Sequence, residues 1–228
     1  MRSNYTMAAP LPSRSIEVCT KPDAMSIVFV IDDDVSVRES LELLINSEGW
    51  EVQLFASAQE FLSKPRAAVP SCLILDVNLP ELNGLELQKQ LTSRTDMPIV
   101  FISGYADVPM SVQAMKAGAV EFLTKPLQED VLLRVIRDGI ERSREALRLD
   151  LEMQALRASY ESLTQREREV MALVVSGLLN KQVGGELGIS EITVKAHRGQ
   201  VMHKMKAESL PDLVTMAARL GLRPTAKE

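Results

Sequence analysis

The sequence of 228 residues predicts two folded regions of different class, an α/β domain on a parallel sheet and a smaller all-α domain. Short apolar segments alternate with amphipathic segments from about residue 26 to 127. A long helical segment follows, free of glycine and proline over residues 140–162, and only helical patterns appear beyond it. These observations predict a doubly wound sheet domain, a connecting helix and a helical domain, in that order.

Five apolar segments are predicted as strands, and the amphipathic segments between them as helices. The strands are expected at residues 27–31, 51–55, 72–75, 98–102 and 120–123, and the helices near 36–48, 57–63, 84–94 and 108–117. Strands that alternate with helices form βαβ units with right-handed crossovers, which gives a five-stranded parallel sheet.

A helix of about thirty residues, ~45 Å long at 1.5 Å per residue, is predicted from about residue 128 to 159. Its first half carries apolar residues at helical spacing that would pack on the sheet, and its second half is interpreted as a linker. The alternative is a shorter helix followed by a frayed tether. The predicted boundaries are a disordered tail at 1–24, the sheet domain at 25–140, the linker helix at 141–160, the helical domain at 161–223 and a tail at 224–228.

The helical domain opens with a helix-start signal. Thr164 is predicted to cap the helix, and Glu167 completes a capping box. Asn180 and Ser190 are expected to cap two further short helices, which are separated by a turn containing Gly188. Two short helices joined by such a turn predict a helix-turn-helix. The helices are expected at 181–187, 191–205 and 210–220.

Composition excludes several classes of protein. The net charge is −5, but residues 160–228 carry ten basic and eight acidic side chains, so the two regions suggest different partners. Cys19 and Cys72, with only two histidines, support neither a disulfide framework nor a zinc site. No apolar run is long enough to span a bilayer, and residues 1–24 lack the apolar core of a signal peptide. We therefore expect a cytoplasmic protein, not bound to membranes, and Met25 is an alternative start.

Acidic, hydroxyl and basic side chains end four of the predicted strands. Asp32 and Asp33 follow the first strand, Asp76 ends the third, Ser103 ends the fourth and Lys125 follows the fifth. The carboxyl ends of parallel strands share one edge, where open α/β sheets bind ligands. Clustered carboxylates repel by about 4 kcal/mol per close pair at an effective dielectric near 20, and Mg²⁺ would relieve that repulsion. The alternative for the first two acids is helix capping in a turn.

Each group has a part in phosphoryl transfer. Asp76 is the predicted nucleophile, which would form an aspartyl phosphate. Lys125 would offset the charge on the phosphoryl group, and the Ser103 hydroxyl would donate to a phosphate oxygen. The predicted magnesium ligands are Asp33, Asp76, the backbone carbonyl of Asn78 and, through water, Asp32.

The motifs resemble those of two-component response regulators, with a receiver domain and a LuxR-type helix-turn-helix. The receiver resemblance rests on IDDD at residues 31–34, LDVNLPELNG at 75–84, SG at 103–104 and TKP at 124–126. DVPM at 107–110 and MKAGAV at 115–120 are similar to the FixJ subgroup. In the second domain the resemblance rests on LTQREREV at 163–170, NKQV at 180–183 and ISEITVKAH at 189–197.

The resemblance implies a flavodoxin-like receiver that a cognate histidine kinase phosphorylates on Asp76 with Mg²⁺. It implies a cis bond between Lys125 and Pro126, and a switch in which Phe122 turns inward as Ser103 moves toward the phosphate. Phe122 as ordinary strand core is the alternative. It further implies a homodimer formed through residues 108–117 and 120–124, which would bind double-stranded promoter DNA and contact RNA polymerase. The expected function is therefore that of a transcription factor and not of an enzyme.

The resemblance places the recognition helix in the major groove, with its N-terminal half toward the bases. Val194, Val201 and Met205 share the opposite face and are predicted core. A solvated helix face is the alternative for each basic residue, and His197 is as consistent with packing or phosphate contact as with base reading. Gly184 and Gly185 replace the usual alanines and suggest a less rigid scaffold helix. The predicted DNA-binding residues are Lys181, Thr193, Lys195, Ala196, His197, Arg198 and Lys204.

Two other functions use the same residues. A magnesium-dependent phosphatase would also form an aspartyl phosphate, but Asn78 stands where such enzymes need a second aspartate. A phospho-dependent adaptor would use the helical domain to bind protein instead of DNA.

Overall fold

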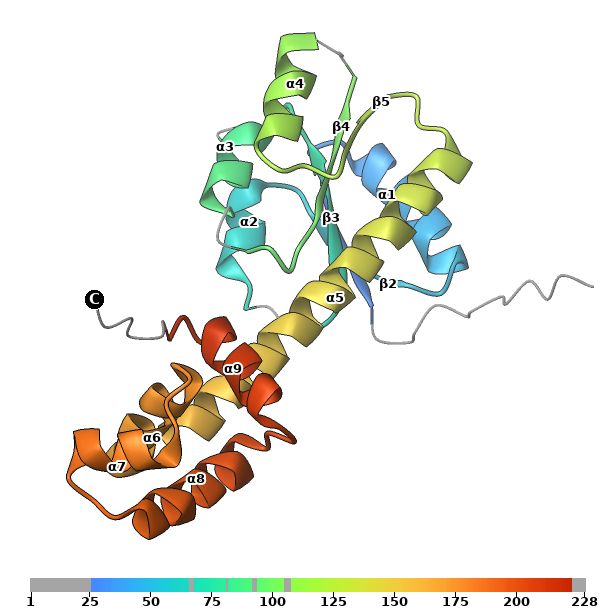
Figure 1. The fold of residues 1–228 in the computed structure, drawn as a ribbon. Helices are drawn as coiled ribbons and strands as arrows, with labels where there is room; N and C mark the ends of the chain where they lie inside the picture. The colour runs from blue at the N-terminus through green and yellow to red at the C-terminus, as the bar shows by residue number, and fades with distance from the viewer. Residues whose placement is uncertain (1–25, 66–67, 81, 92–93, 105–107, 223–228) are drawn as a thin grey trace, which may run out of the picture.

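The computed structural model describes residues 26–65, 68–80, 82–91, 94–104 and 108–222. Figure 1 shows an α/β domain and a helical domain at opposite ends of one long helix. The predicted tails, 1–24 and 224–228, lie outside the described residues, as do Met25 and the first residue of the DVPM motif. Within the described residues, no helix is both long and apolar enough to cross a membrane.

The α/β domain is built on a five-stranded parallel sheet in the order β2-β1-β3-β4-β5. The predicted fold class is therefore confirmed, and each strand lies within a residue of its expected bounds. The strands are β1 Ile27–Ile31, β2 Glu51–Phe55, β3 Ser71–Asp76, β4 Ile99–Ser103 and β5 Glu121–Thr124.

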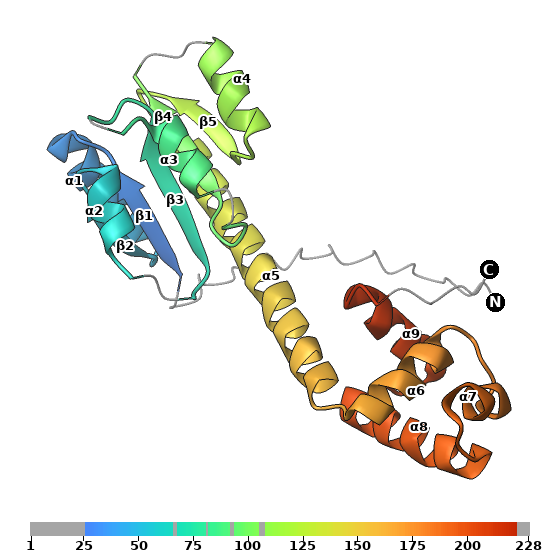
Figure 2. The same ribbon diagram turned by 90° about the vertical axis from the view of Figure 1, so that its left-hand side faces the viewer.

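Helices cover both faces of the sheet, and the central strands are apolar on both sides for this reason. Alternate residues of β1 point to opposite faces, so Phe29 joins one core cluster and Val28 the other. One face packs against α2 Ala58–Ser63, α3 Gly84–Gln90 and α4 Val108–Lys116, and the other against α1 Val35–Ser47 and the start of α5. Figures 1 and 2 show these two layers of helices.

The connecting segment is one continuous helix, α5 Glu129–Glu161, of 33 residues. Its first part packs on the sheet through residues such as Leu132 and Ile136, and Leu156 near its end is buried in the core of the helical domain. Ser143 is also buried; its hydroxyl donates to the Asp96 carbonyl at 2.5 Å and accepts from the Ser71 amide at 2.9 Å. The segment predicted as a linker is thus packed at both ends, and it is helical throughout.

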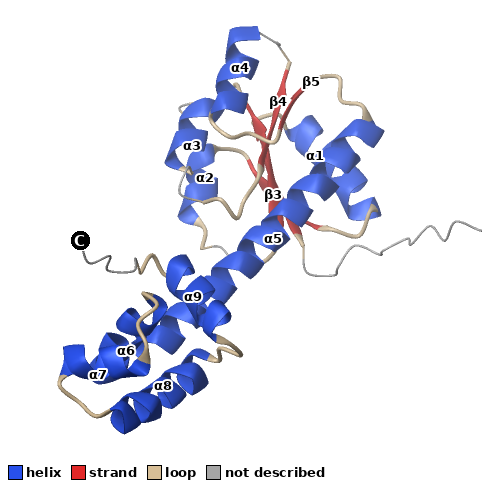
Figure 3. Cartoon of the chain, in the orientation of Figure 1, coloured by secondary structure: helices blue, strands red, loops and turns tan. Residues whose placement is uncertain are grey.

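The second domain contains α6 Gln165–Val175, α7 Asn180–Leu187, α8 Glu191–Met205 and α9 Leu210–Arg219, as Figure 3 shows. The Thr164 capping box with Glu167 and the Ser190 cap are confirmed. The predicted Asn180 cap is wrong, because Leu179 is the cap residue and Asn180 is the first residue of α7. Gln182 reaches back to accept from the Leu179 amide at 2.8 Å and so satisfies it.

Gly184 has a packing role that the sequence did not reveal. A Cβ atom there would lie 2.7 Å from the Ile189 carbonyl oxygen, in the turn between α7 and α8. The absence of a side chain therefore lets the two helices approach closely. Gly185, in contrast, has open space around it. Only Gly185 fits the expectation of a glycine that merely lowers helix stability.

Candidate functional site

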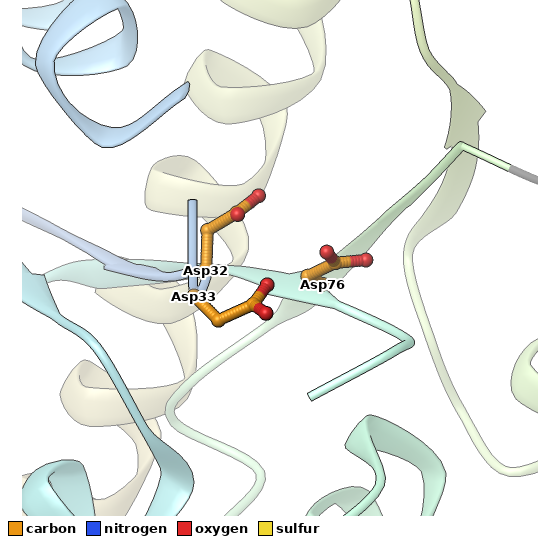
Figure 4. Close-up of side chains that lie close together, drawn as sticks. All are labelled: Asp32, Asp33 and Asp76. Carbon is orange, nitrogen blue, oxygen red and sulfur yellow. The ribbon is translucent and has the colours of Figure 1, made fainter. Parts of the chain in front are cut away.

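Three carboxylates meet at the carboxyl edge of the sheet. Ile31 of β1 lies beside Leu75 of β3, so the next residues, Asp32 and Asp76, extend from neighbouring strands. One carboxylate oxygen from each of Asp32, Asp33 and Asp76 lies within 4.8 Å of the others. Figure 4 shows the Asp33 carboxylate directed toward Asp76. The predicted convergence of these acids is therefore present in the structure.

Lys125 lies in the same pocket and bridges two of the acids. Its Nζ atom lies 2.7 Å from Asp32 Oδ2 and 3.2 Å from Asp76 Oδ2. The Lys125 amide donates to the Ser103 carbonyl at 2.8 Å, which ties the end of β5 to the end of β4. The peptide bond between Lys125 and Pro126 is cis, as predicted.

Burial and charge shift the proton affinities of this pair. Desolvation raises the pKa of the Asp32 carboxyl, whose side chain is 0% exposed, although the hydrogen bond from Lys125 lowers it. Burial by itself would lower the pKa of Lys125, but the hydrogen bonds and charges of Asp32 and Asp76 outweigh that effect and raise it. The lysine is therefore held in its charged form between two acids.

The pocket has further support that the sequence analysis missed. Arg38 of α1 donates from Nη1 to the Asp32 carbonyl at 2.5 Å, and the Asp34 amide donates to Asp32 Oδ1 at 2.9 Å. These contacts fix the turn that follows β1. Gly84 lies so close to the backbone of Asp76 that a Cβ at residue 84 would be 2.5 Å from the Asp76 carbonyl oxygen. Gly84 ends the motif at residues 75–84, so the sequence indicated that this glycine belongs to the site. No motif in the sequence indicated a role for Arg38.

The predicted switch residues lie on the two strands beyond Asp76. Ile102 of β4 is the register partner of Asp76, so Ser103 extends one residue further along the same edge, and it is fully buried. Phe122 of β5 is half-buried, and its ring stacks on that of Phe101 with centroids 6.2 Å apart. Phe122 thus contacts the apolar core on its β4 side. The backbone N–H of Asn78 donates to Asp76 Oδ1 at 3.3 Å.

The predicted DNA-binding residues do not share one surface. Thr193, Lys195 and Ala196 are exposed on the first half of α8, and His197 is partly exposed there. Lys195 forms an ion pair of 3.3 Å with Glu191, one turn away. Arg198 donates to the side chain of Asn180 on α7 at 3.2 Å, so part of its guanidinium holds the two helices together. Lys181 is exposed on α7.

Lys204, near the end of α8, is paired within the helical domain. Its ammonium lies 2.7 Å from Glu167 Oε2 and donates to the Ser162 carbonyl at 3.3 Å. The Glu167 side chain is only 6% exposed, and the hydrogen bond from Lys204 lowers its pKa. Lys204 therefore joins α8 to the start of α6, with its side chain 29% exposed. Contact of Lys204 with DNA stays a prediction, and such a contact would compete with this ion pair.

The fold and the pocket together define a class of protein. A parallel sheet of this strand order, with an acid cluster held by a lysine at its carboxyl edge, is the arrangement of a receiver domain, and a helix-turn-helix follows it. Residues 28–137 match the family described as response regulator receiver domain, and residues 161–217 match bacterial regulatory proteins of the luxR family. The chain belongs to the response regulators that combine these two domains.

Individual relatives agree with this assignment. The chain is 47% identical to nodulation protein W of Bradyrhizobium diazoefficiens, over 89% of this chain and 90% of that protein. It is 40% identical to the transcriptional regulatory protein FixJ of the same organism, over 86% of this chain and 96% of that one. A solved structure of the response regulator StyR matches with a TM-score of 0.77 and 45% identity, over 86% of this chain and 99% of that chain. The resemblance drawn from the motifs is confirmed.

Proposed function

We propose that the chain is a transcription factor that a histidine kinase phosphorylates on Asp76 with Mg²⁺, and that the phosphorylated form dimerises and binds promoter DNA. The observation that carries the proposal is the position of Lys125 between Asp32 and Asp76, at the edge where Asp33 completes the acid cluster. A nucleophilic carboxylate, a counter-charge and oxygen ligands for a metal are thereby in one pocket.

In the proposed reaction an oxygen of Asp76 attacks the phosphorus of a phosphohistidine, a P–O bond forms and the P–N bond breaks. Mg²⁺ would be held by Asp33, Asp76 and the Asn78 carbonyl, with Asp32 acting through water, and would supply charge neutralisation at the phosphoryl oxygens. Lys125, already charged and in place, offsets the negative charge from the other side.

Phosphorylation places a phosphoryl group of about −1.5 to −2 charges beside β4 and β5, in place of the single charge of the Asp76 carboxylate. The proposed response is a movement of Ser103 toward the phosphate and of Phe122 into the space that it leaves. An apolar stripe on α4 supports dimerisation at this face, because Val108, Val112 and Met115 repeat at helical spacing and are exposed. We assign residues 108–117 and 120–124 to the dimer interface.

DNA binding is assigned to α8 and the start of α7. Lys195, Ala196 and His197 lie on the first half of α8, where recognition helices approach base edges. Lys181 and Thr193 are exposed and would contact phosphates. Arg198 can contribute only with the part of its guanidinium that Asn180 does not use. The bound dimer would then present its surface to RNA polymerase.

The first test is chemical phosphorylation of the full chain. Acetyl phosphate with Mg²⁺ should add one phosphoryl group, detected by intact mass, and increase the dimer fraction in analytical ultracentrifugation. Chelation of Mg²⁺ with EDTA should stop the labelling. Asp76→Asn should show neither change while it unfolds at the same denaturant concentration, and continued labelling of that variant would refute the assignment.

The second test concerns DNA. Lys195→Ala should weaken binding of the phosphorylated chain to its promoter site and reduce the slope of log affinity against log salt by about one unit. Arg134→Ala serves as a control, because it removes one exposed positive charge from α5, far along the chain from α8. An unchanged affinity and slope in Lys195→Ala would remove that residue from the contact set.

The residue at position 78 disfavours the alternative hypothesis of a magnesium-dependent phosphatase. Asn78 lies two residues after Asp76, so the position that would need a second acid holds an amide side chain. Repeated turnover of small phosphate esters would nevertheless favour the enzyme. A phosphorylated chain that binds no promoter fragment would favour the protein adaptor.

A further inference from the structure

The first turn of α8 exposes an isoleucine. Ile192 is 81% exposed, more than the other large apolar side chains in the described part of the chain, of which Leu43 at 75% comes next. Single exposed apolar residues are ordinary on protein surfaces. Ile192, however, lies one turn before Lys195 on α8, the helix proposed to bind DNA, so its exposure bears on how that helix contacts DNA.

Ile192 lies diametrically opposite the buried face of α8. At about 100° per residue, the core residues Val194, Val201 and Met205 share one direction, and Ile192, Ala196, Gly199 and His203 share the opposite one. We call these four residues the outer stripe. The outer stripe is therefore the part of α8 that would enter the groove most deeply when the helix docks on DNA.

The chemistry of the outer stripe near the helix start is apolar. Ala196 and Gly199 have no side-chain donor or acceptor, and a Cβ at Gly199 would meet no atom within 4 Å apart from its chain neighbours and its own helix backbone. Both residues therefore let the helix axis approach a partner. Lys195 flanks the stripe, with its side chain 63% exposed, and Lys181 is exposed on the neighbouring helix. The outer stripe with these lysines beside it is complementary to a polyanion that has apolar groups in a groove.

Double-stranded DNA has such a group in one place. The C5-methyl of thymine projects into the major groove and is read by apolar side chains. We propose that Ile192 is a specificity-determining residue that packs against a thymine methyl group in each half-site. This inference rests on the proposed DNA-binding function, and it names the feature of the DNA that this surface recognises.

The experiment uses the full chain phosphorylated with acetyl phosphate. A binding site is first selected from a random double-stranded DNA library, and each thymine is then replaced in turn by deoxyuridine, which removes only the methyl group. For the unaltered chain we expect one thymine per half-site at which replacement weakens binding about fourfold, the change that corresponds to ~0.8 kcal/mol for one buried methyl-sized group. Fluorescence anisotropy measures the affinities.

Ile192→Ala should weaken binding to the thymine site and show no further loss on the deoxyuridine duplex, because the contact is already absent. Leu43→Ala is the matched control, since it removes an exposed apolar side chain from α1 and should keep the fourfold discrimination. Circular dichroism should show all three proteins equally folded, because both side chains are exposed.

Two results would overturn the inference while DNA binding stands. One is tight binding in which no thymine is sensitive to loss of its methyl group. The other is an Ile192→Ala variant that still discriminates fully between the thymine and the deoxyuridine duplex. If that variant binds DNA normally but fails to stimulate purified RNA polymerase, the outer stripe is a contact for protein and not for DNA. Failure to select any DNA would instead overturn the proposed function together with this inference.

Discussion

The acidic pocket and the recognition helix are built in opposite ways. The pocket gathers Asp32, Asp76 and Lys125 from three strands, each supported by a sheet that is covered on both faces. The surface of α8 comes from a single helix, which a small core and a few polar contacts hold in place. The pocket therefore depends on charge placed by distant residues, and the recognition surface on the packing beneath it.

The largest effect is expected from the counter-charge in the pocket. Lys125→Ala removes the ammonium that lies 2.7 Å from Asp32 and 3.2 Å from Asp76. The rate of phosphorylation by acetyl phosphate should fall by about 10²–10³-fold, the range for loss of one preorganised electrostatic group. Mg²⁺ should bind more tightly, because the acids lose a competing cation. A rate near that of the unaltered chain would show that the pocket does not rely on this charge.

The helical domain should depend on a residue from α5. Leu156→Ala removes a buried side chain from its core and should lower the free energy of unfolding of that domain by about 2–5 kcal/mol. Leu149→Ala on the same helix is the control; its side chain is 46% exposed, and its effect should stay within about 0.5 kcal/mol. Denaturant titration measures both. Equal effects would mean that α5 is only a tether.

Two adjacent glycines of α7 should respond with opposite sign. Gly184→Ala places a Cβ 2.7 Å from the Ile189 carbonyl and should destabilise the domain by about 1–3 kcal/mol. Gly185→Ala meets open space and should stabilise it by up to ~1 kcal/mol through helix propensity. Thermal unfolding followed at the helical signal distinguishes them. The same sign for both would refute the close approach of α7 to the turn before α8.

The smallest effect concerns the ion pair between Glu167 and Lys204, and it depends on pH. The hydrogen bond from Lys204 lowers the pKa of Glu167 from its ordinary value of 4.5, so the folded state favours the carboxylate. The resulting stability is present above pH 4.5 and is lost as the pH falls through the lowered folded-state pKa. Glu167→Gln keeps an acceptor for the Thr164 amide but loses the charge, so it should be less stable at pH 7.

Denaturant titrations of the unaltered chain and Glu167→Gln, made from pH 7 down to acid pH, would check this. The difference between the two proteins should shrink as the pH falls below 4.5. A difference that stays constant with pH would assign the stability to hydrogen bonding alone and would contradict a contribution from the charge of Glu167.

Local patterns in the sequence were sufficient for the class of fold and for most of the pocket. Alternating apolar and amphipathic segments predict parallel strands, and parallel strands bring their carboxyl ends to one edge, so Asp32, Asp76 and Lys125 were expected to converge. The capping box of Thr164 was equally visible, because a cap involves residues three positions apart. These features follow from near neighbours and from the geometry common to all parallel sheets.

Only the tertiary structure decided which faces of the helices meet. Lys204 and Glu167 are 37 residues apart, and no local pattern distinguished a lysine paired inside the domain from one that faces DNA. The need for glycine at residue 184 depends on how closely α7 meets the following turn, and the exposure of Ile192 depends on which side of α8 is covered. Helical periodicity defines the faces of a helix, but packing against the rest of the chain determines which face is buried and which is left for a partner.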